Sequence, residues 1–267
     1  MHKHMPIFRP VMAAAFVLAG VVLHGPTAHA VSLPYSEDFN DGTADDFEFF
    51  EAGNGDWSIG GGTLNLGASS GTQQVNAASV NVSDDLSSKT IRMSMSFTWS
   101  FPINRTPDIG FAAFGETPNF AFTNVYDTDD QHYLADVKSN GSMRILKNDG
   151  SAFINIVTSP SEFTFSLDET YELILLIEPL DNGDRKLTLT IDDPLQGLVS
   201  ISGVDEVDVD GPLLTGDYFG IRTYDRQTAS FDDFSIAEVA IVPEPSTGLL
   251  VLALLGLGLT CWRRKRG

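Results

Sequence analysis

The sequence predicts an all-β protein, a two-sheet antiparallel jelly-roll sandwich. Short runs rich in β-branched and aromatic residues recur along the chain, turn residues separate them, and no long stretch has the period of an amphipathic helix. The clearest run, residues 90–99, places alternate apolar side chains on one face: Ile91, Met93, Met95, Phe97 and Trp99. Once the termini are set aside, roughly 210 residues remain, enough for one sandwich with one core.

The expected strands follow one another at short spacing. In chain order they are residues 56–59, 63–66, 79–82, 90–99, 108–114, 133–137, 142–146, 153–157, 171–177, 187–191, 218–223 and 230–239. Turn sequences separate them, such as the three glycines at 60–62 and the Asn-Gly pair at 140–141. No internal repeat is visible, which argues against a propeller. Trp57 and Trp99 are expected in the core rather than on a ligand platform.

The C-terminal segment has three parts in a fixed order. Val242-Pro243-Glu244-Pro245 is followed by an apolar run over 246–262, and four basic residues occupy 263–266. A helix over this run would be about 25 Å long, which is just enough to cross the hydrocarbon of a membrane. The basic tail would then remain in the cytoplasm by the positive-inside rule.

This order of features resembles the PEP-CTERM sorting signal of Gram-negative bacteria. The resemblance covers residues 242–267 and implies an inner-membrane protein whose C-terminus an exosortase cuts near the Pro-Glu-Pro triplet. The released body would then reach the cell surface or the extracellular matrix. An ordinary C-terminal membrane anchor is the alternative.

The N-terminus has the features of a signal peptide. Lys3 and Arg9 are basic, residues 11–23 are apolar, and Ala28-His29-Ala30 is a small-x-small cleavage site for signal peptidase. A retained N-terminal anchor is the alternative. The chain is therefore divided into a signal peptide at 1–30, a jelly-roll domain at 31–240 and a sorting segment at 241–267.

Charge and composition exclude several classes of function. The chain has a net charge of −20, and the body from 31 to 245 has 10 basic and 36 acidic residues, so its charge is 10 − 36 = −26. Such a body repels nucleic acid. The one cysteine, Cys261, lies in the expected membrane span, and His132 is the one histidine of the body. Disulfides, cysteine-ligated zinc and histidine-cluster metal sites are therefore excluded from the body.

Short motifs near both ends of the body resemble concanavalin A-like, laminin-G-like jelly rolls of secreted bacterial proteins. They are the acidic turn at 37–42, the hairpin segments at 55–59 and 62–66, and the closing strands at 218–224 and 229–236. The resemblance spans residues 33–239 and implies the fold. It leaves the function open, because this fold includes lectins, glycoside hydrolases and adhesion modules.

The resemblance also implies that the first and last strands are neighbours. Four carboxylates, those of Glu37, Asp38, Asp232 and Asp233, would then be crowded together. Crowded carboxylates repel one another unless a cation lies among them, and oxygen ligands select a hard ion such as Ca²⁺. We therefore expect a structural calcium at these residues. The alternative is that one carboxylate of each pair faces solvent.

A second acidic cluster contains Glu206, Asp208, Asp210 and Asp217. Its spacing partly matches a calcium-binding loop, but Glu replaces Asp at the first position and Pro212 follows Gly211. Read as a strand, the cluster is similar to the Glu-x-Asp-x-Glu strand of laminarinase-like glycoside hydrolases, although the last acid is Asp. An exposed acidic loop is the favoured interpretation.

A third acidic stretch lies beside His132. Tyr126 and Tyr133 flank Asp127 and Asp129, so carboxylates and ring faces could together hold a sugar. A solvated loop is the more common structure for such a stretch.

These observations predict an exported, non-enzymatic surface or matrix protein that associates with exopolysaccharide. No residue is assigned a catalytic role. A glycoside hydrolase or lyase of the concanavalin A-like class is the alternative, and it would need a carboxylate pair about 5–9 Å apart in a groove. A purely structural surface protein is the third possibility.

Overall fold

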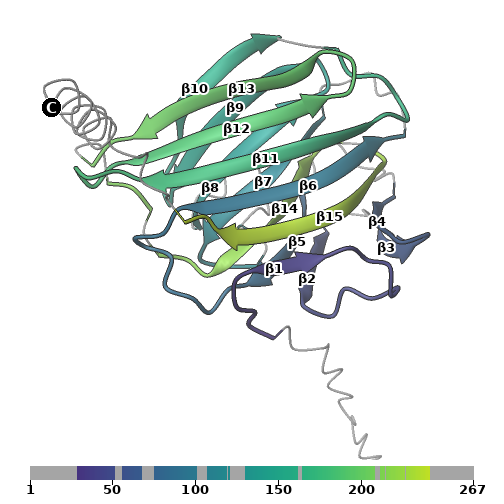
Figure 1. Ribbon diagram of the computed structural model, residues 1–267, viewed down its shortest axis with the longest axis horizontal. Coiled ribbons are helices and arrows are strands. Elements are labelled where there is room, and N and C mark those ends of the chain that lie inside the picture. The colour runs from purple at the N-terminus through teal and green to yellow at the C-terminus, as the bar shows by residue number, and fades with distance from the viewer. Residues whose placement is uncertain are drawn as a thin grey trace, which may run out of the picture.

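The computed structural model describes residues 29–51, 56–67, 75–100, 107–118, 120, 130–161, 164–207, 211–213, 215–225 and 227–240. These residues form two antiparallel β-sheets packed face to face, with the eight-stranded sheet in front in Figure 1. In the described ranges no helix is long and apolar enough to cross a membrane. The expected signal-peptide core and the expected membrane span lie outside these ranges.

The eight-stranded sheet contains strands from both ends of the body. Its order is β13 (Gly197–Asp205), β12 (Arg185–Asp193), β11 (Thr170–Pro179), β6 (Ile91–Trp99), β15 (Ala229–Glu238), β4 (Thr63–Leu66) and β3 (Trp57–Gly60), and β1 (Tyr35–Glu37) also pairs with β15. The first and last strands are therefore neighbours, as expected, with Glu37 opposite Phe234.

The seven-stranded sheet packs behind it (Figure 1). Its order is β10 (Phe153–Ser161), β9 (Ser142–Asp149), β8 (Gln131–Lys138), β7 (Asp108–Gly115), β14 (Tyr218–Tyr224), β5 (Val75–Asn81) and β2 (Phe47–Glu51). All pairs are antiparallel. The two-sheet jelly roll expected from the sequence is confirmed.

The core lies between the sheets and follows the predicted alternation. The five apolar side chains of β6 are at most 3% exposed. β11 and β12 add six fully buried side chains: Leu173, Leu175, Ile177, Leu187, Leu189 and Ile191. Burying one such side chain contributes about 1.5–3 kcal/mol, so this layer supplies much of the stability of the sandwich.

Both tryptophans pack as expected. Trp99 is 3% exposed, and its Nε1–H donates to Oε1 of Gln227 at 2.5 Å. Trp57 is half-buried, with its ring centroid 5.8 Å from that of Phe231.

The side-chain pattern did not predict three strands, β1, β2 and β13, and the first of them was expected only from the family resemblance. In β13 the outward positions include Leu198 and Val204, which are 70% and 42% exposed. These two apolar residues face solvent, so the apolar–polar alternation that identifies a half-buried strand is lost at both ends of β13. Strands β1 and β2 are too short to show a period.

Candidate functional site

The outer face of the eight-stranded sheet displays mostly short polar side chains. Between its buried apolar residues, β6 directs Ser94, Ser96 and Thr98 outward, and β15 directs Ser230 and Asp232 outward. Because successive side chains of a strand point to opposite faces, the alternation that fills the core also builds this surface. We call it the hydroxyl face.

One row of polar side chains crosses five strands of the hydroxyl face in register. Ser58 of β3 lies opposite Asn65 of β4, Asn65 opposite Ser230 of β15, Ser230 opposite Thr98 of β6, and Thr98 opposite Thr170 of β11. We call these five residues the polar row. The hydroxyls of Thr98 and Thr170 are hydrogen-bonded to each other at 3.0 Å.

A groove of about 160 Å³ lies on the hydroxyl face over one end of the polar row, at Ser230, Thr98 and Thr170. Its lining is dominated by hydroxyls and carboxylates: Thr63, Ser96, Thr98, Thr170, Ser230, Asp232 and Asp233, with Phe97 and Phe231 beneath. The pairing of β15 with β6 is irregular between Asp232 and Ser235, and Asp233 has a φ of 51°. This bulge places two successive acidic residues at the same groove, because a bulge redirects side chains that would otherwise alternate.

The four carboxylates expected to bind calcium are only partly brought together. The Glu37 carboxylate accepts a hydrogen bond from the Phe39 N–H at 2.7 Å, and Asp232 accepts one from the Asp233 N–H at 2.8 Å. Partial burial raises the pKa of Asp232, and the nearby charges of Asp233 and Asp38 add to the rise.

These residues do not form a ligand set for a cation as they stand. In the part of the chain that the structure describes, no group of three or more His, Cys, Asp or Glu side chains is placed to hold a metal ion. Calcium at the first and last strands therefore stays a prediction, which chelation can test.

The other acidic clusters lie mostly outside the described residues. Asp208 and Asp210 are outside them, while Glu206 follows β13 and Asp217 precedes β14. The backbone carbonyl of Asp217 accepts a hydrogen bond from the Val82 N–H at 2.7 Å. The arrangement of this second cluster therefore stays a prediction.

The expected sugar site around Tyr126, Asp127, Asp129 and Tyr133 needs a correction at Tyr133. The first three residues lie outside the described ranges. Tyr133 is fully buried between the sheets, where its hydroxyl donates to Asp205 at 2.6 Å and accepts from the Leu213 N–H at 2.9 Å. The prediction that Tyr133 offers a ring face to a sugar is wrong, because its position in β8 points inward.

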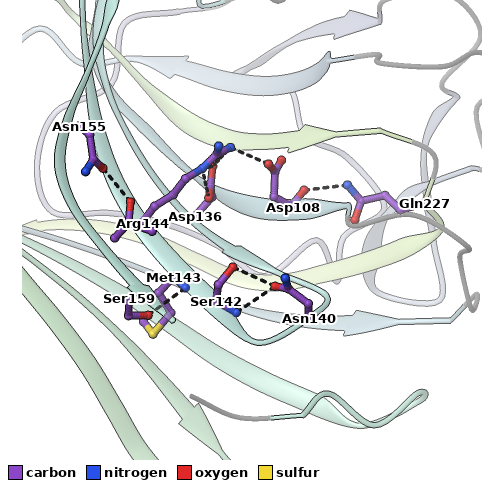
Figure 2. Close-up of polar contacts among 10 residues, drawn as sticks. Asp108, Asp136, Asn140, Ser142, Met143, Arg144, Asn155, Ser159 and Gln227 are labelled. Atoms are coloured by element: carbon purple, nitrogen blue, oxygen red, sulfur yellow. Dashed lines mark hydrogen bonds and ion pairs between the residues drawn. The ribbon is translucent and has the colours of Figure 1, made fainter. Parts of the chain in front are cut away.

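The outer face of the seven-stranded sheet carries a buried ion cluster. Arg144 lies between two carboxylates, with its Nε 2.8 Å from Asp136 and its Nη2 2.7 Å from Asp108 (Figure 2). On the other side of Asp108, the backbone carbonyl accepts a hydrogen bond from Gln227 at 2.8 Å. Burial raises the pKa of Asp108 to about 7, and Asp136 adds to the rise while Arg144 and Arg222 oppose it.

A carboxyl with a raised pKa beside a second carboxyl resembles an acid/base pair. Here both carboxyls contact the same guanidinium, and Asp108 and Asp136 are 2% and 0% exposed. Neither can present an oxygen to a substrate in this arrangement. We interpret the cluster as a structural tie among β7, β8 and β9.

His132 lies in the seven-stranded sheet, like the ion cluster, and does not reach the hydroxyl face on the other sheet. It is fully buried, with ring centroids of Phe120 and Phe153 at 5.7 and 6.1 Å. Burial lowers the pKa of His132 to about 3, and Arg222 adds to this effect. The serines of the hydroxyl face lie on the other sheet, so this imidazole and those hydroxyls form no catalytic triad.

Comparison with known proteins settles the C-terminal segment. Residues 242–266 match the model of the PEP-CTERM protein-sorting motif. The chain carries a PEP-CTERM sorting motif. The match includes Val242, Pro243, Glu244 and Pro245, and it confirms the predicted sorting segment. Such a motif indicates export and attachment to a membrane through the C-terminus before cleavage by an exosortase.

Solved structures with the same fold include a seed lectin, a carbohydrate recognition domain and a sugar-bound exoplasmic domain, all of low sequence identity. The Lotus tetragonolobus seed lectin is 11% identical, covers 78% of this chain and 98% of its own, and has a TM-score of 0.53. The carbohydrate recognition domain of Emp47p is 14% identical; the match covers 76% of this chain and 95% of that domain, with a TM-score of 0.54. The Ca²⁺/Man2-bound exoplasmic domain of VIP36 is 11% identical; the match covers 80% of this chain and 91% of that domain, with a TM-score of 0.52. These similarities establish the concanavalin A-like jelly-roll fold. No curated protein matches the chain in sequence.

The groove was missed by sequence reasoning, apart from Asp232 and Asp233. Its signal is present in residues 94–98, where serine, serine and threonine alternate with methionine and phenylalanine. The polar half of that alternation shows only that one face of the strand is hydrophilic. Nothing local to the strand showed that polar residues of β15 and β11 lie beside it, or that those of β4 lie one strand further on.

Proposed function

We propose that this protein is an exported, non-catalytic carbohydrate-binding protein that associates with extracellular polysaccharide. The groove on the hydroxyl face carries this proposal, since it combines hydroxyls with the carboxylates of Asp232 and Asp233. Sugar hydroxyls both donate and accept hydrogen bonds. Serine and threonine hydroxyls can do the same, and carboxylates accept from several donors at once.

Asp232 is the central binding residue of this proposal. One of its oxygens accepts the Asp233 N–H, which fixes the orientation of the carboxylate, and the other oxygen carries further lone pairs for ligand hydroxyls. Hydrogen bonds to a charged acceptor are the stronger ones, contributing about 1.5–3 kcal/mol each. A carboxylate held in this way gives directional recognition without any covalent step.

Binding of the full-length chain in detergent to a panel of polysaccharides tests the proposal. Asp232→Asn should lower the affinity at least about tenfold, since it removes a charged acceptor. Asp192→Asn is the matched control, because Asp192 is exposed on the same face but lies outside the groove. Equal loss of binding in both variants, or no binding to any polysaccharide, would overturn the assignment of the groove.

The same samples distinguish binding from hydrolysis. We expect no release of reducing ends from β-1,3-glucans, β-1,4-glucans or the exopolysaccharide of the producing cell. Turnover that disappears in Glu206→Gln would instead support the glycoside hydrolase alternative. Repeating the binding assay with a chelator shows whether calcium contributes.

Export and processing are tested by intact-mass measurement of the protein released from cells. We expect signal peptidase to leave Val31 as the first residue and exosortase to leave a C-terminus between Pro243 and Pro245. A released protein that still contains Cys261 would contradict cleavage at the motif.

A further inference from the structure

We propose that the groove is one end of a longer site, in which an uncharged, extended polysaccharide lies across the strands along the polar row. This inference rests on the proposed carbohydrate-binding function. It adds two properties that the groove does not specify: the direction in which the ligand runs and its lack of charge.

The direction follows from the register of the strands. The polar row continues beyond the groove, to Asn65 and Ser58 on β4 and β3. Five adjacent strands about 4.8 Å apart span about 19 Å, which is longer than a single sugar ring. A monosaccharide would leave part of the row unused, whereas a chain of several sugars can meet every member.

The hydroxyls of the row are held ready for such a ligand. The Thr98 and Thr170 hydroxyls share one hydrogen bond at 3.0 Å, so one of their two protons is used and the other can be donated outward. Threonine is β-branched and has few χ1 states, and the shared bond restricts them further. Little side-chain entropy is then lost when a ligand binds.

The lack of charge follows from the ionic groups around the row. In the described strands of this face the outward basic residues are Arg92 and Lys186, and each is paired with a glutamate. Arg92 lies 3.3 Å from Glu172, and Lys186 lies 3.5 Å from Glu178.

The unbalanced charges on this face are therefore acidic. Asp232 and Asp233 line the groove, and Asp192 is exposed two strands beyond β6. A polysaccharide that carries carboxylate or sulfate groups would be repelled, most strongly at low salt. A neutral polysaccharide would meet no such penalty.

Among the described residues of the central strands β11, β6 and β15, no aromatic ring points outward on this face. The rings of Phe97, Trp99 and Phe231 point into the core, where they are at most 3% exposed. Affinity must then come from several hydrogen bonds of modest strength rather than from stacking. Such a site binds longer chains more tightly, because each further sugar adds contacts.

Calorimetry with the full-length chain in detergent tests both properties. The probes are neutral β-1,3- and β-1,4-gluco-oligosaccharides from disaccharide to octasaccharide, with oligogalacturonates of matched length as the anionic probes. We expect the affinity for neutral probes to rise about tenfold or more from disaccharide to pentasaccharide and then to level off. Oligogalacturonates should bind at least about tenfold more weakly at low salt, with a smaller gap at high salt.

Two substitutions locate the ligand on the face. Thr98→Val is nearly isosteric and should weaken pentasaccharide binding about fivefold, the loss expected for one or two hydrogen bonds. Thr188→Val is the matched control, because Thr188 has the same kind of hydroxyl pair, 2.9 Å from Ser202, but lies outside the polar row. If Thr98→Val changes the melting temperature, Ser230→Ala replaces it.

The outcomes separate this inference from the proposed function. Equal affinity for short and long neutral probes, still lost in Asp232→Asn, would keep the proposed function and overturn the extended site. Tighter binding of oligogalacturonate at low salt, or equal losses in Thr98→Val and Thr188→Val, would also overturn the inference. Failure of every sugar to bind would overturn both.

Discussion

Protonation of His132 should destabilise the fold in mild acid. The imidazole is fully buried, its Nδ1 is 3.2 Å from the Asp130 carbonyl oxygen, and burial lowers its pKa from 6.5 to about 3. The unfolded chain takes up this proton near pH 6.5, whereas the folded protein resists it until about pH 3. Unfolding therefore binds a proton within this window, and stability falls as the pH falls through it.

The size of the effect follows from the shift. One pKa unit corresponds to about 1.4 kcal/mol, so at pH 5 His132 lowers the free energy of unfolding by about 2 kcal/mol relative to pH 7.5. For a domain of this size that is about 4–8 °C in melting temperature. By pH 3 the effect approaches its ceiling of about 5 kcal/mol.

The perturbation is His132→Phe, which keeps a ring beside Phe120 and Phe153 but cannot take up a proton. At pH 7.5 the variant should lose about 1 kcal/mol with the lost hydrogen bond. At pH 5 it should be about as stable as the wild type or more stable. Urea unfolding at a series of pH values measures the difference.

Other groups titrate in the same range with the opposite sign. Burial raises the pKa of Asp108 to about 7 and that of Asp130 to about 6, so the folded state gains stability as the pH falls through these values. Both carboxyl groups are present in the wild type and in the His132→Phe variant, so their contributions cancel when the two free energies of unfolding are subtracted. Asp130 lies 3.7 Å from His132, so Asp130→Asn in both backgrounds is the control. A stability difference that does not change between pH 7.5 and 5 would refute the reasoning.

Three further outcomes are expected. Gly110→Ala should prevent folding or cost several kcal/mol, because its Cβ would clash with the Ala135 carbonyl oxygen. Gly60→Ala is the control and should be tolerated, because no atom lies nearer than 4.0 Å to its Cβ; thermal melting compares the two variants. Gln227→Ala should cost about 2–3 kcal/mol in chemical unfolding, since it leaves the indole N–H of Trp99 without its acceptor; an unchanged midpoint would contradict that role. If calcium ties the first strand to the last, excess calcium should raise the melting temperature by several degrees, and chelation should reverse the rise. A hundredfold excess of calcium over its Kd should stabilise the folded state by about 2.7 kcal/mol. A melting curve that does not change with chelator would contradict a structural calcium.

Much of the fold was predictable because alternation is a local property. Residues 90–99 show directly which side chains of β6 enter the core, and the same alternation identified most of the other strands. β13 was missed because Leu198 and Val204 face solvent at its edge position. The order of the strands was not predictable from local pattern, apart from the neighbouring first and last strands that the family resemblance implied.

The candidate site divides in the same way. The sequence by itself determined the sorting motif, the acidic body and the polar residues on one face of β6, because each depends on neighbours along the chain. Only the tertiary structure decided that Asn65, Ser230, Thr98 and Thr170 form one row, since their strands are far apart in sequence and pair through long-range hydrogen bonds. It also decided that Tyr133 is buried rather than presented to a ligand: the period of a strand separates two faces, but the packing of the second sheet determines which face is covered.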